Sequence, residues 1–267
     1  MESSNPILKG AYGSRRGYAA MDRIPVAEDN LEATYAAPSA SSLRTGRMTM
    51  DDVVTRTAIL FGTALVVGAA AWYLKLDNLL FFGLIGGLAT GLIGAISRKV
   101  RPALYLAYAV CQGLVLGIIS RVYEAFYDGI VQQAIVATSA AFFGMLFLYK
   151  SGRLRATPKF VRMLMGAAIG YFILALGSFI GSFFGLGDGW GLYGLSGFGP
   201  LLAIAGVAIA SFFLILDFDQ IDQGIRTGVP EQESWRAGFG LLMTMVWLYM
   251  EVLRLLAILR GDDRDRK

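Results

Sequence analysis

The sequence predicts an all-α integral membrane protein, a bundle of seven transmembrane helices. Of the 267 residues, 55% are hydrophobic and only 16% are charged, with a mean hydropathy of +0.56. Soluble domains usually carry about 25% charged residues. The apolar residues fall into seven runs, each close to the ~20 residues needed to cross a ~30 Å hydrocarbon core. Because lipid offers no partner to exposed backbone groups, we expect these runs to be helices rather than strands.

The seven predicted spans cover residues 57–74, 78–96, 102–123, 130–149, 160–184, 198–218 and 237–259. Proline is tolerated in the first turn of a helix and disrupts its interior, so the prolines help to place the boundaries. Three lie at or near predicted helix starts and one lies in a polar connection, namely Pro102, Pro158, Pro200 and Pro230. None interrupts the middle of a span.

The chain outside the spans has a different composition. Residues 1–50 are rich in Ser, Gly, Ala and Pro with scattered charges, and we expect a disordered cytoplasmic N-terminal tail there. An apolar core followed by a small-residue cleavage site is missing, which argues against a secretory signal peptide. The helical domain is predicted over residues 51–260, and residues 261–267 form a short charged C-terminal tail.

Lys and Arg in the connections predict the orientation. The connections after the second, fourth and sixth spans hold ten basic residues, namely Arg98, Lys99, Arg101, Lys150, Arg153, Arg155, Lys159, Arg162, Arg226 and Arg236. The opposite connections hold only two, Lys75 and Arg121. The positive-inside rule therefore places the N-terminus in the cytoplasm and, after seven crossings, the C-terminus outside. A last segment that re-enters without crossing remains the alternative.

The composition excludes several classes of function. The chain has no histidine, which removes Ser-His and Cys-His nucleophiles and His-ligated zinc, and its one cysteine, Cys111, lies in an apolar run. Its positive charge lies in short connections rather than in a stripe, so we expect no nucleic-acid partner. Tyr127-Asp128 and Gly185-Leu186-Gly187-Asp188 echo the motifs of intramembrane aspartyl proteases, but loop turns explain both. We expect no enzyme and no cofactor.

Ionisable groups inside the spans are the candidate functional residues, because each costs about 2.5–3.5 kcal/mol to insert. Asp217 ends the apolar run of the sixth span, and Glu251 and Arg254 lie in the seventh. Glu251 and Arg254 are three residues apart and share a helix face. Gln112 is a polar residue of the third span.

Asp217 and Glu251 precede and follow the connection of an antiparallel hairpin, so we expect them to approach one another. This requires the sixth helix to continue to about Arg226, with a turn near Gly228. Asp219 and Asp222 would then line a polar cytoplasmic mouth. Two acids in contact cannot both ionise cheaply, which predicts a proton-sensitive pair. Two simpler interpretations remain open: Asp217 as a solvated helix-end acid, and Glu251–Arg254 as a self-neutralised pair.

Three short motifs resemble the Bax inhibitor-1 family, specifically its bacterial YccA-like branch. The seventh span contains Tyr249-Met250-Glu251-Val252-Leu253-Arg254-Leu255, similar to Tyr-Leu-Asp-x-x-Asn-Leu. The run Asp217-Phe218-Asp219-Gln220-Ile221 is similar to Asp-Thr-Gln-x-Ile, and Gln112-Gly113-Leu114-Val115-Leu116-Gly117 to Glu-Gly-Leu-x-Leu-Gly. The resemblance covers about residues 50–260 and leaves the tail outside.

The resemblance implies a pH-sensitive calcium leak in the inner (plasma) membrane, gated by a pair of acids in the sixth and seventh helices. Carried over by position, the acids are Asp217 and Glu251, with calcium as a candidate ion at both. The family's latch, a basic residue of the second helix, maps best to Arg98. Three departures weaken calcium conduction: Glu251 for Asp, Gln112 for Glu, and Arg254 for Asn, whose charge repels a divalent cation.

A second function fits the same residues. The chain would be a non-conducting membrane regulator that binds a membrane protease or a stress protein, with the tail as its docking element. The lipid bilayer is the partner common to both functions, and the sequence leaves the oligomeric state open. Ion flux in liposomes separates the leak from the regulator.

Overall fold

The computed structural model describes residues 46–154, 156–184 and 199–265. The predicted disorder of residues 1–45 and the Gly185–Asp188 motif lie outside these residues. The described helices are α4 (Met50–Tyr73), the short 3-10 helix η1 (Asp77–Leu79), α5 (Leu80–Ile96), α6 (Pro102–Phe126), α7 (Ile130–Lys150), α8 (Pro158–Phe183), α9 (Gly199–Thr227) and α10 (Glu233–Asp265).

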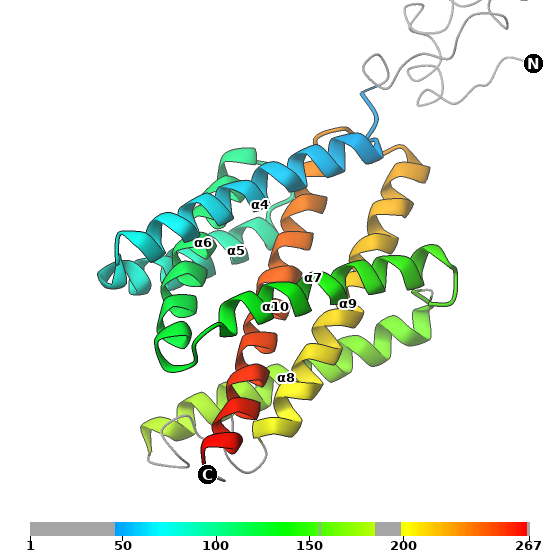
Figure 1. Ribbon diagram of the computed structural model, residues 1–267. Helices are drawn as coiled ribbons and strands as arrows, with labels where there is room; N and C mark the ends of the chain where they lie inside the picture. Colours follow the sequence, from blue (N-terminus) through cyan, green and yellow to red (C-terminus); the bar gives the residue numbers. More distant parts are fainter. Residues whose placement is uncertain (1–45, 155, 185–198, 266–267) are drawn as a thin grey trace, which may run out of the picture. The chain divides into compact units, whose positions relative to one another are not determined.

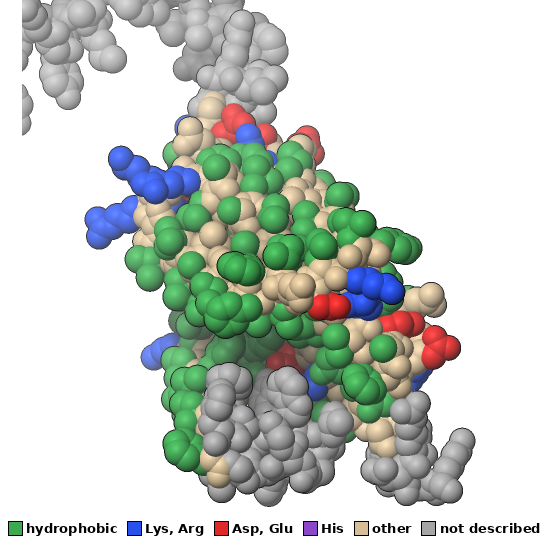
Figure 2. Space-filling view, turned by 90° about the vertical axis from the view of Figure 1, so that its left-hand side faces the viewer, with side chains coloured by type: hydrophobic (Ala, Val, Ile, Leu, Met, Phe, Trp, Pro, Cys, Tyr) green, Lys and Arg blue, Asp and Glu red, His purple; other side chains and the backbone are tan. Residues whose placement is uncertain are grey.

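Seven spans in the described part of the chain are long and apolar enough to cross a membrane, which confirms the predicted all-α membrane fold. Each predicted run lies within one helix or, for the second, within η1 and α5, except for one end residue of the first, fifth and sixth runs. Large hydrophobic side chains remain exposed on the outer faces, among them Phe81, Phe82 and Leu88 of α5. Figure 2 shows such side chains spread over one face of the molecule. A surface of this kind suits contact with lipid rather than water.

Local chemistry sets the helix ends. Thr49 caps α4 in a capping box, because its hydroxyl accepts from the Asp52 amide at 3.3 Å while the Thr49 amide donates to the Asp52 carboxylate at 3.0 Å. Before α7, the Glu124 carboxylate accepts from the Gly129 amide at 2.6 Å and the Val131 amide at 3.0 Å. Gly228 follows α9 with a φ of +68°, a conformation that glycine adopts without strain.

Helix α10 is central to the bundle. Within its apolar window 56% of the residues are buried, against 17% for α4 or α7. It packs against α9, α4, α7 and α6, and Figure 1 shows it passing between α4 and α9. Leu248 and Leu253 of α10 are fully buried in a core that also contains Leu214 of α9 and Ile130 of α7. A side chain on α10 can therefore contact several helices.

Helices α4 and α6 touch through glycines. A Cβ added at Gly117 of α6 would overlap the Gly68 carbonyl oxygen of α4, and one at Gly113 would lie 2.6 Å from the Ala64 carbonyl oxygen. Only residues without side chains allow backbones this close. The buried glycines of α5, Gly83, Gly87, Gly91 and Gly94, form a second such surface.

The last helix crosses the whole bundle. Near its start, Arg236 donates to the carbonyl oxygens of Ser97 and Arg98, in the connection before α6. Near its end, Arg260 donates to the Asp128 carbonyl oxygen, in the connection after α6. Because these connections lie at opposite ends of α6, α10 runs along the whole length of α6.

Two boundaries differ from the expected ones. Residues 46–48 pair with the α9–α10 connection: the Met48 amide donates to the Val229 carbonyl and the Glu231 amide to the Gly46 carbonyl, both at 2.8 Å. Met48 is only 4% exposed, so at least this residue of the expected tail is packed in the helical domain. At the other end, α10 continues to Asp265 through most of the expected C-terminal tail.

Candidate functional site

The structure does not bring Asp217 and Glu251 together, and the predicted acid pair was wrong. The Glu251 carboxyl carbon lies 2.7 Å from the ideal Cβ position of Gly206, eleven residues before Asp217 on α9. At a rise of about 1.5 Å per residue, the two acids are roughly 16 Å apart along the helix axis. Asp217 instead faces Gly240, whose ideal Cβ position is 3.7 Å from its Oδ1 atom.

The short connection between the helices explains the separation. Helix α9 continues past Asp217 to Thr227, as the pairing hypothesis required, and α10 begins at Glu233. Asp217 is ten residues from its end of the hairpin, whereas Glu251 is eighteen residues from the other. In an antiparallel hairpin this difference alone offsets the acids by about 12 Å.

Glu251 lies in a buried polar cluster. Its carboxylate lies 3.2 Å from Arg254 Nη2 and accepts hydrogen bonds from the Tyr171 hydroxyl at 2.5 Å and the Trp247 indole N–H at 3.2 Å. Glu251 and Arg254 are 5% and 8% exposed. Opposite charges with hydrogen-bonded neighbours limit the cost of burial. The geometry agrees with the interpretation as a self-neutralised pair, and Tyr171 adds a link to α8.

Asp217 has a different environment. Its carboxylate forms a side-chain hydrogen bond with Thr244 of α10, while its Oδ2 atom is buried without a hydrogen-bond partner among the described residues. The side chain lines a cavity of about 420 Å³ with Met48, Glu233 and Arg236. Arg236 pairs with Glu233 at 2.8 Å rather than with Asp217. An acid with a free acceptor beside a cavity can bind a proton, water or a cation.

Asp219 and Asp222 lie near the end of α9 and line a larger cavity of about 1210 Å³. The Tyr149 hydroxyl donates to both carboxylates at 3.4 Å, and Arg226 pairs with Asp222 at 2.8 Å. Gln223 donates to Asp219 at 2.5 Å. These acids are therefore grouped at the polar end of the bundle, as expected of a mouth, but their charges are partly matched by neighbours.

Two further sequence candidates, Arg98 and Gln112, form no described side-chain contact with Asp217 or Glu251. Arg98 follows the end of α5 at Ile96 and is exposed, and no described ion pair includes it. The described ion pairs therefore give no support to a latch at Arg98, and that role stays a prediction. Gln112 of α6 packs on α5, with Nε2 2.9 Å from the ideal Cβ position of Gly87, and hydrogen-bonds with Tyr108.

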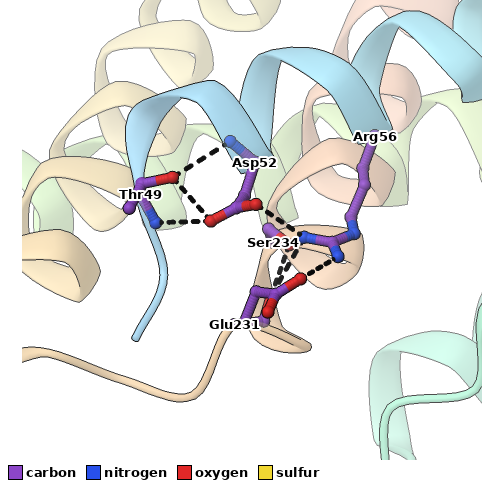
Figure 3. Close-up of polar contacts among 5 residues, drawn as sticks. All are labelled: Thr49, Asp52, Arg56, Glu231 and Ser234. Atoms are coloured by element: carbon purple, nitrogen blue, oxygen red, sulfur yellow. Dashed lines mark hydrogen bonds and ion pairs between the residues drawn. The ribbon is translucent and has the colours of Figure 1, made fainter. Parts of the chain in front are cut away.

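Sequence reasoning missed a polar cluster around Arg56 of α4 (Figure 3). The guanidinium pairs with the Glu231 carboxylate, donates to the Ser234 hydroxyl at 2.6 Å and lies 3.5 Å from Asp52. It also lies over the Trp235 ring, 5.7 Å from its centroid. Arg56 thus joins the start of α4 to the α9–α10 connection. The spacing of Asp52 and Arg56 signals an i, i+4 pair, but nothing in the sequence points to Glu231.

The described residues contain no group of three or more Asp, Glu, Cys or His side chains that could hold a metal ion. Since Asp217 and Glu251 are apart, they cannot jointly ligate calcium, which takes six to eight oxygen ligands. The candidate site instead contains Asp217, whose hydrogen-bonding capacity is only partly satisfied, and, further along the bundle, the buried Glu251–Arg254 ion pair.

Comparison with known protein families shows a match over nearly the whole chain. A family model described as Bax inhibitor 1 like matches residues 5–261. The match begins well before residue 50, so the tail that was expected to lie outside the family resemblance falls inside it. No curated protein matches the chain.

Proposed function

We propose, on the premise that this chain belongs to the Bax inhibitor 1-like family, that it forms a proton-sensitive leak for cations and that Asp217 binds the controlling proton. The chain is a multi-pass membrane protein, and its described residues include seven apolar helices long enough to span a membrane. We place it in the inner membrane on the basis of the family resemblance, and we place the N-terminus in the cytoplasm on the basis of the basic connections. The proposal assigns it no catalytic reaction and no cofactor.

The observation that carries the proposal is the unpartnered Oδ2 atom of Asp217 beside a cavity. The cavity is also lined by Gln220, Glu233 and Arg236, which are polar or charged. A buried carboxylate without a full set of hydrogen bonds is costly, and it lowers that cost by taking up a proton or attracting a cation and water.

The direction of the pH response follows from this environment. At low pH Asp217 is protonated and neutral, the form that an apolar surrounding favours, and the helices stay closed. At higher pH it loses the proton, and the charge draws water and cations into the cavity. We therefore expect flux to rise with pH.

Leu214 and Leu248, both fully buried, lie in the core between the levels of Asp217 and Glu251, and in this proposal such apolar side chains close the pathway. The Glu251–Arg254 pair lies beyond this layer. Asp219 and Asp222 would concentrate cations at the polar end, calcium among them. The positive charge of Arg254 opposes divalent cations, so we propose a weakly selective leak.

Flux into proteoliposomes tests the proposal. The full chain is reconstituted, and calcium and monovalent cation flux are measured from pH 5 to pH 8. We expect flux that rises with pH in the unaltered chain and stays low in Asp217→Asn. The matched control is Asp51→Asn, an exposed acid in the first turn of α4, which should behave like the unaltered chain. The role of Asp217 would be rejected if flux through the unaltered chain did not change with pH, or if Asp217→Asn retained the pH response.

One observation favours the non-conducting regulator as a second candidate. Residues 46–48 are hydrogen-bonded to the α9–α10 connection, directly after the N-terminal segment in the chain. A protease or stress protein that binds residues 1–45 could act on the hairpin through this bridge. Absence of any flux, together with an effect of deleting residues 2–45 on a bound partner, would favour the regulator.

A further inference from the structure

The larger cavity has the form of a groove along the bundle. Its walls come from α4, between Met50 and Phe61, and from α7, between Ser139 and Lys150, while Phe218 and Leu241 of α9 and α10 lie between them. The ends of each wall are eleven residues apart, which corresponds to a length of about 16 Å. That length matches about half of a ~30 Å hydrocarbon core, the depth of one leaflet.

The groove is open towards the side. Helices α4 and α7 both pack against α10 but do not pack closely against one another. The lining residues Val54 of α4 and Phe143 of α7 are 59% and 65% exposed. In a protein that spans a membrane, this opening faces the acyl chains of the surrounding lipid. Its volume of about 1210 Å³ exceeds the ~300–1,000 Å³ usual for small-molecule sites.

The groove is apolar along its length and charged at one end. Tyr149, Lys150, Asp219, Asp222 and Arg226 all line that end, which lies at the termini of α7 and α9. The two positive and two negative charges balance. Arg226 is already paired with Asp222, whereas no described ion pair includes Lys150. A headgroup that carries both a phosphate and an ammonium group complements this end, with the phosphate at Lys150 and the ammonium near Asp219.

We propose that this groove is a binding site for one phospholipid with a zwitterionic, amine-bearing headgroup. One acyl chain lies between α4 and α7 on Phe218 and Leu241, and the phosphate contacts Lys150. The site takes its lipid from the leaflet at the end of the bundle where α4 begins. It is separate from Asp217, which lines the smaller cavity, and the inference does not depend on ion conduction.

Native mass spectrometry of the full chain in detergent tests the site, with phosphatidylethanolamine titrated into the micelles. We expect one lipid to be retained at a low lipid ratio. Ala58→Trp fills the groove from α4 and Ser139→Trp fills it from α7, and each should weaken retention at least tenfold. Ala89→Trp is the matched control, since Ala89 is an exposed residue of α5 outside the groove and should leave retention unchanged. Equal retention in all three variants would overturn the proposal.

Two variants test the headgroup contact. Lys150→Gln should weaken retention of phosphatidylethanolamine several-fold, while Lys99→Gln, an exposed basic residue between α5 and α6, should not. Phosphatidylglycerol, which has the phosphate without the ammonium, should bind more weakly, and diacylglycerol should bind weakest. Equal binding of all three lipids would show a non-specific acyl contact and reject the headgroup assignment.

The N-terminal segment is the competing occupant, because it precedes α4 at the same end. Deleting residues 2–45 should leave lipid retention unchanged. If a lipid is retained only after this deletion, the segment itself fills the groove and the lipid proposal fails. The thermal stability of each variant, measured in the same detergent, separates loss of the lipid from loss of the fold.

Discussion

Glu251 of α10 lies against Gly206 of α9, with its carboxyl carbon 2.7 Å from where a Cβ would stand. The Tyr171 hydroxyl occupies the same place from α8. A side chain at position 206 would therefore collide with the two groups that hold α8 against α10. The absence of a side chain at Gly206 is what lets the buried polar cluster form between three helices.

Gly206→Ala should accordingly destabilise the protein by about 1–3 kcal/mol, the usual cost of overpacking. The measurement is the unfolding midpoint in detergent. Gly170→Ala is the control, because a Cβ at that position of α8 meets nothing within 4 Å. It should be neutral, or stabilising by up to ~1 kcal/mol, because alanine favours helix. Equal midpoints for both variants would show that the Glu251 cluster is not tightly packed.

The separation of the two acids predicts independent effects on flux. Asp217→Asn should abolish the rise of flux with pH, because the neutral amide mimics the protonated acid. Glu251→Gln should preserve the pH response and change only the amplitude. The change in the logarithm of flux in the double variant should then equal the sum of the changes in the two single variants. The reason is that the effects of substitutions at distant sites without shared partners are additive. A double variant no worse than Asp217→Asn alone would instead favour direct coupling of the acids.

The Arg56 cluster should hold the start of α4 to the α9–α10 connection. Arg56→Gln should increase hydrogen exchange in residues 46–56 and 228–234, measured by mass spectrometry in nanodiscs. Glu231→Gln should have a similar effect, and the double variant should add little. The expected coupling is about 1 kcal/mol, because the pair is only partly shielded from solvent. Arg98→Gln, which removes an exposed charge, should change neither segment, and an equal effect there would point to net charge instead.

Orientation can be tested with single cysteines in a Cys111→Ala background. Ser151→Cys lies in the connection after α7 and should be labelled from the cytoplasmic side. Asp128→Cys lies in the connection before α7 and should be labelled from the opposite side. Helix α7 is long enough to be a complete span, so labelling of both cysteines from one side would contradict its passage through the membrane. Labelling of each cysteine from the side opposite to the one expected would show that the orientation is inverted.

Much of the fold could be predicted because lipid imposes one dominant rule. The spans starting at Pro102 and near Pro158 begin where proline indicated, and the run ending at Asp217 continues as a helix to Thr227, followed by a turn at Gly228. The length of an apolar run and the positions of helix-breaking residues are local properties of the sequence. Each span can therefore be predicted from its own residues alone. The positions of Asp217, Glu251 and Arg254 as ionisable groups inside the spans were visible for the same reason.

The sequence by itself thus determined the seven spans, their order and the few charged groups inside them, since these follow from transfer energies and local backbone preferences. Only the tertiary structure decided which groups meet. Vertical offset between α9 and α10 separates Asp217 from Glu251, and the lack of a side chain at Gly206 seats Glu251 between helices. The contact of Arg56 with Glu231, 175 residues apart, likewise depends on how whole helices pack. Such relationships arise from the relative height and rotation of rigid elements, which no local pattern of residues encodes.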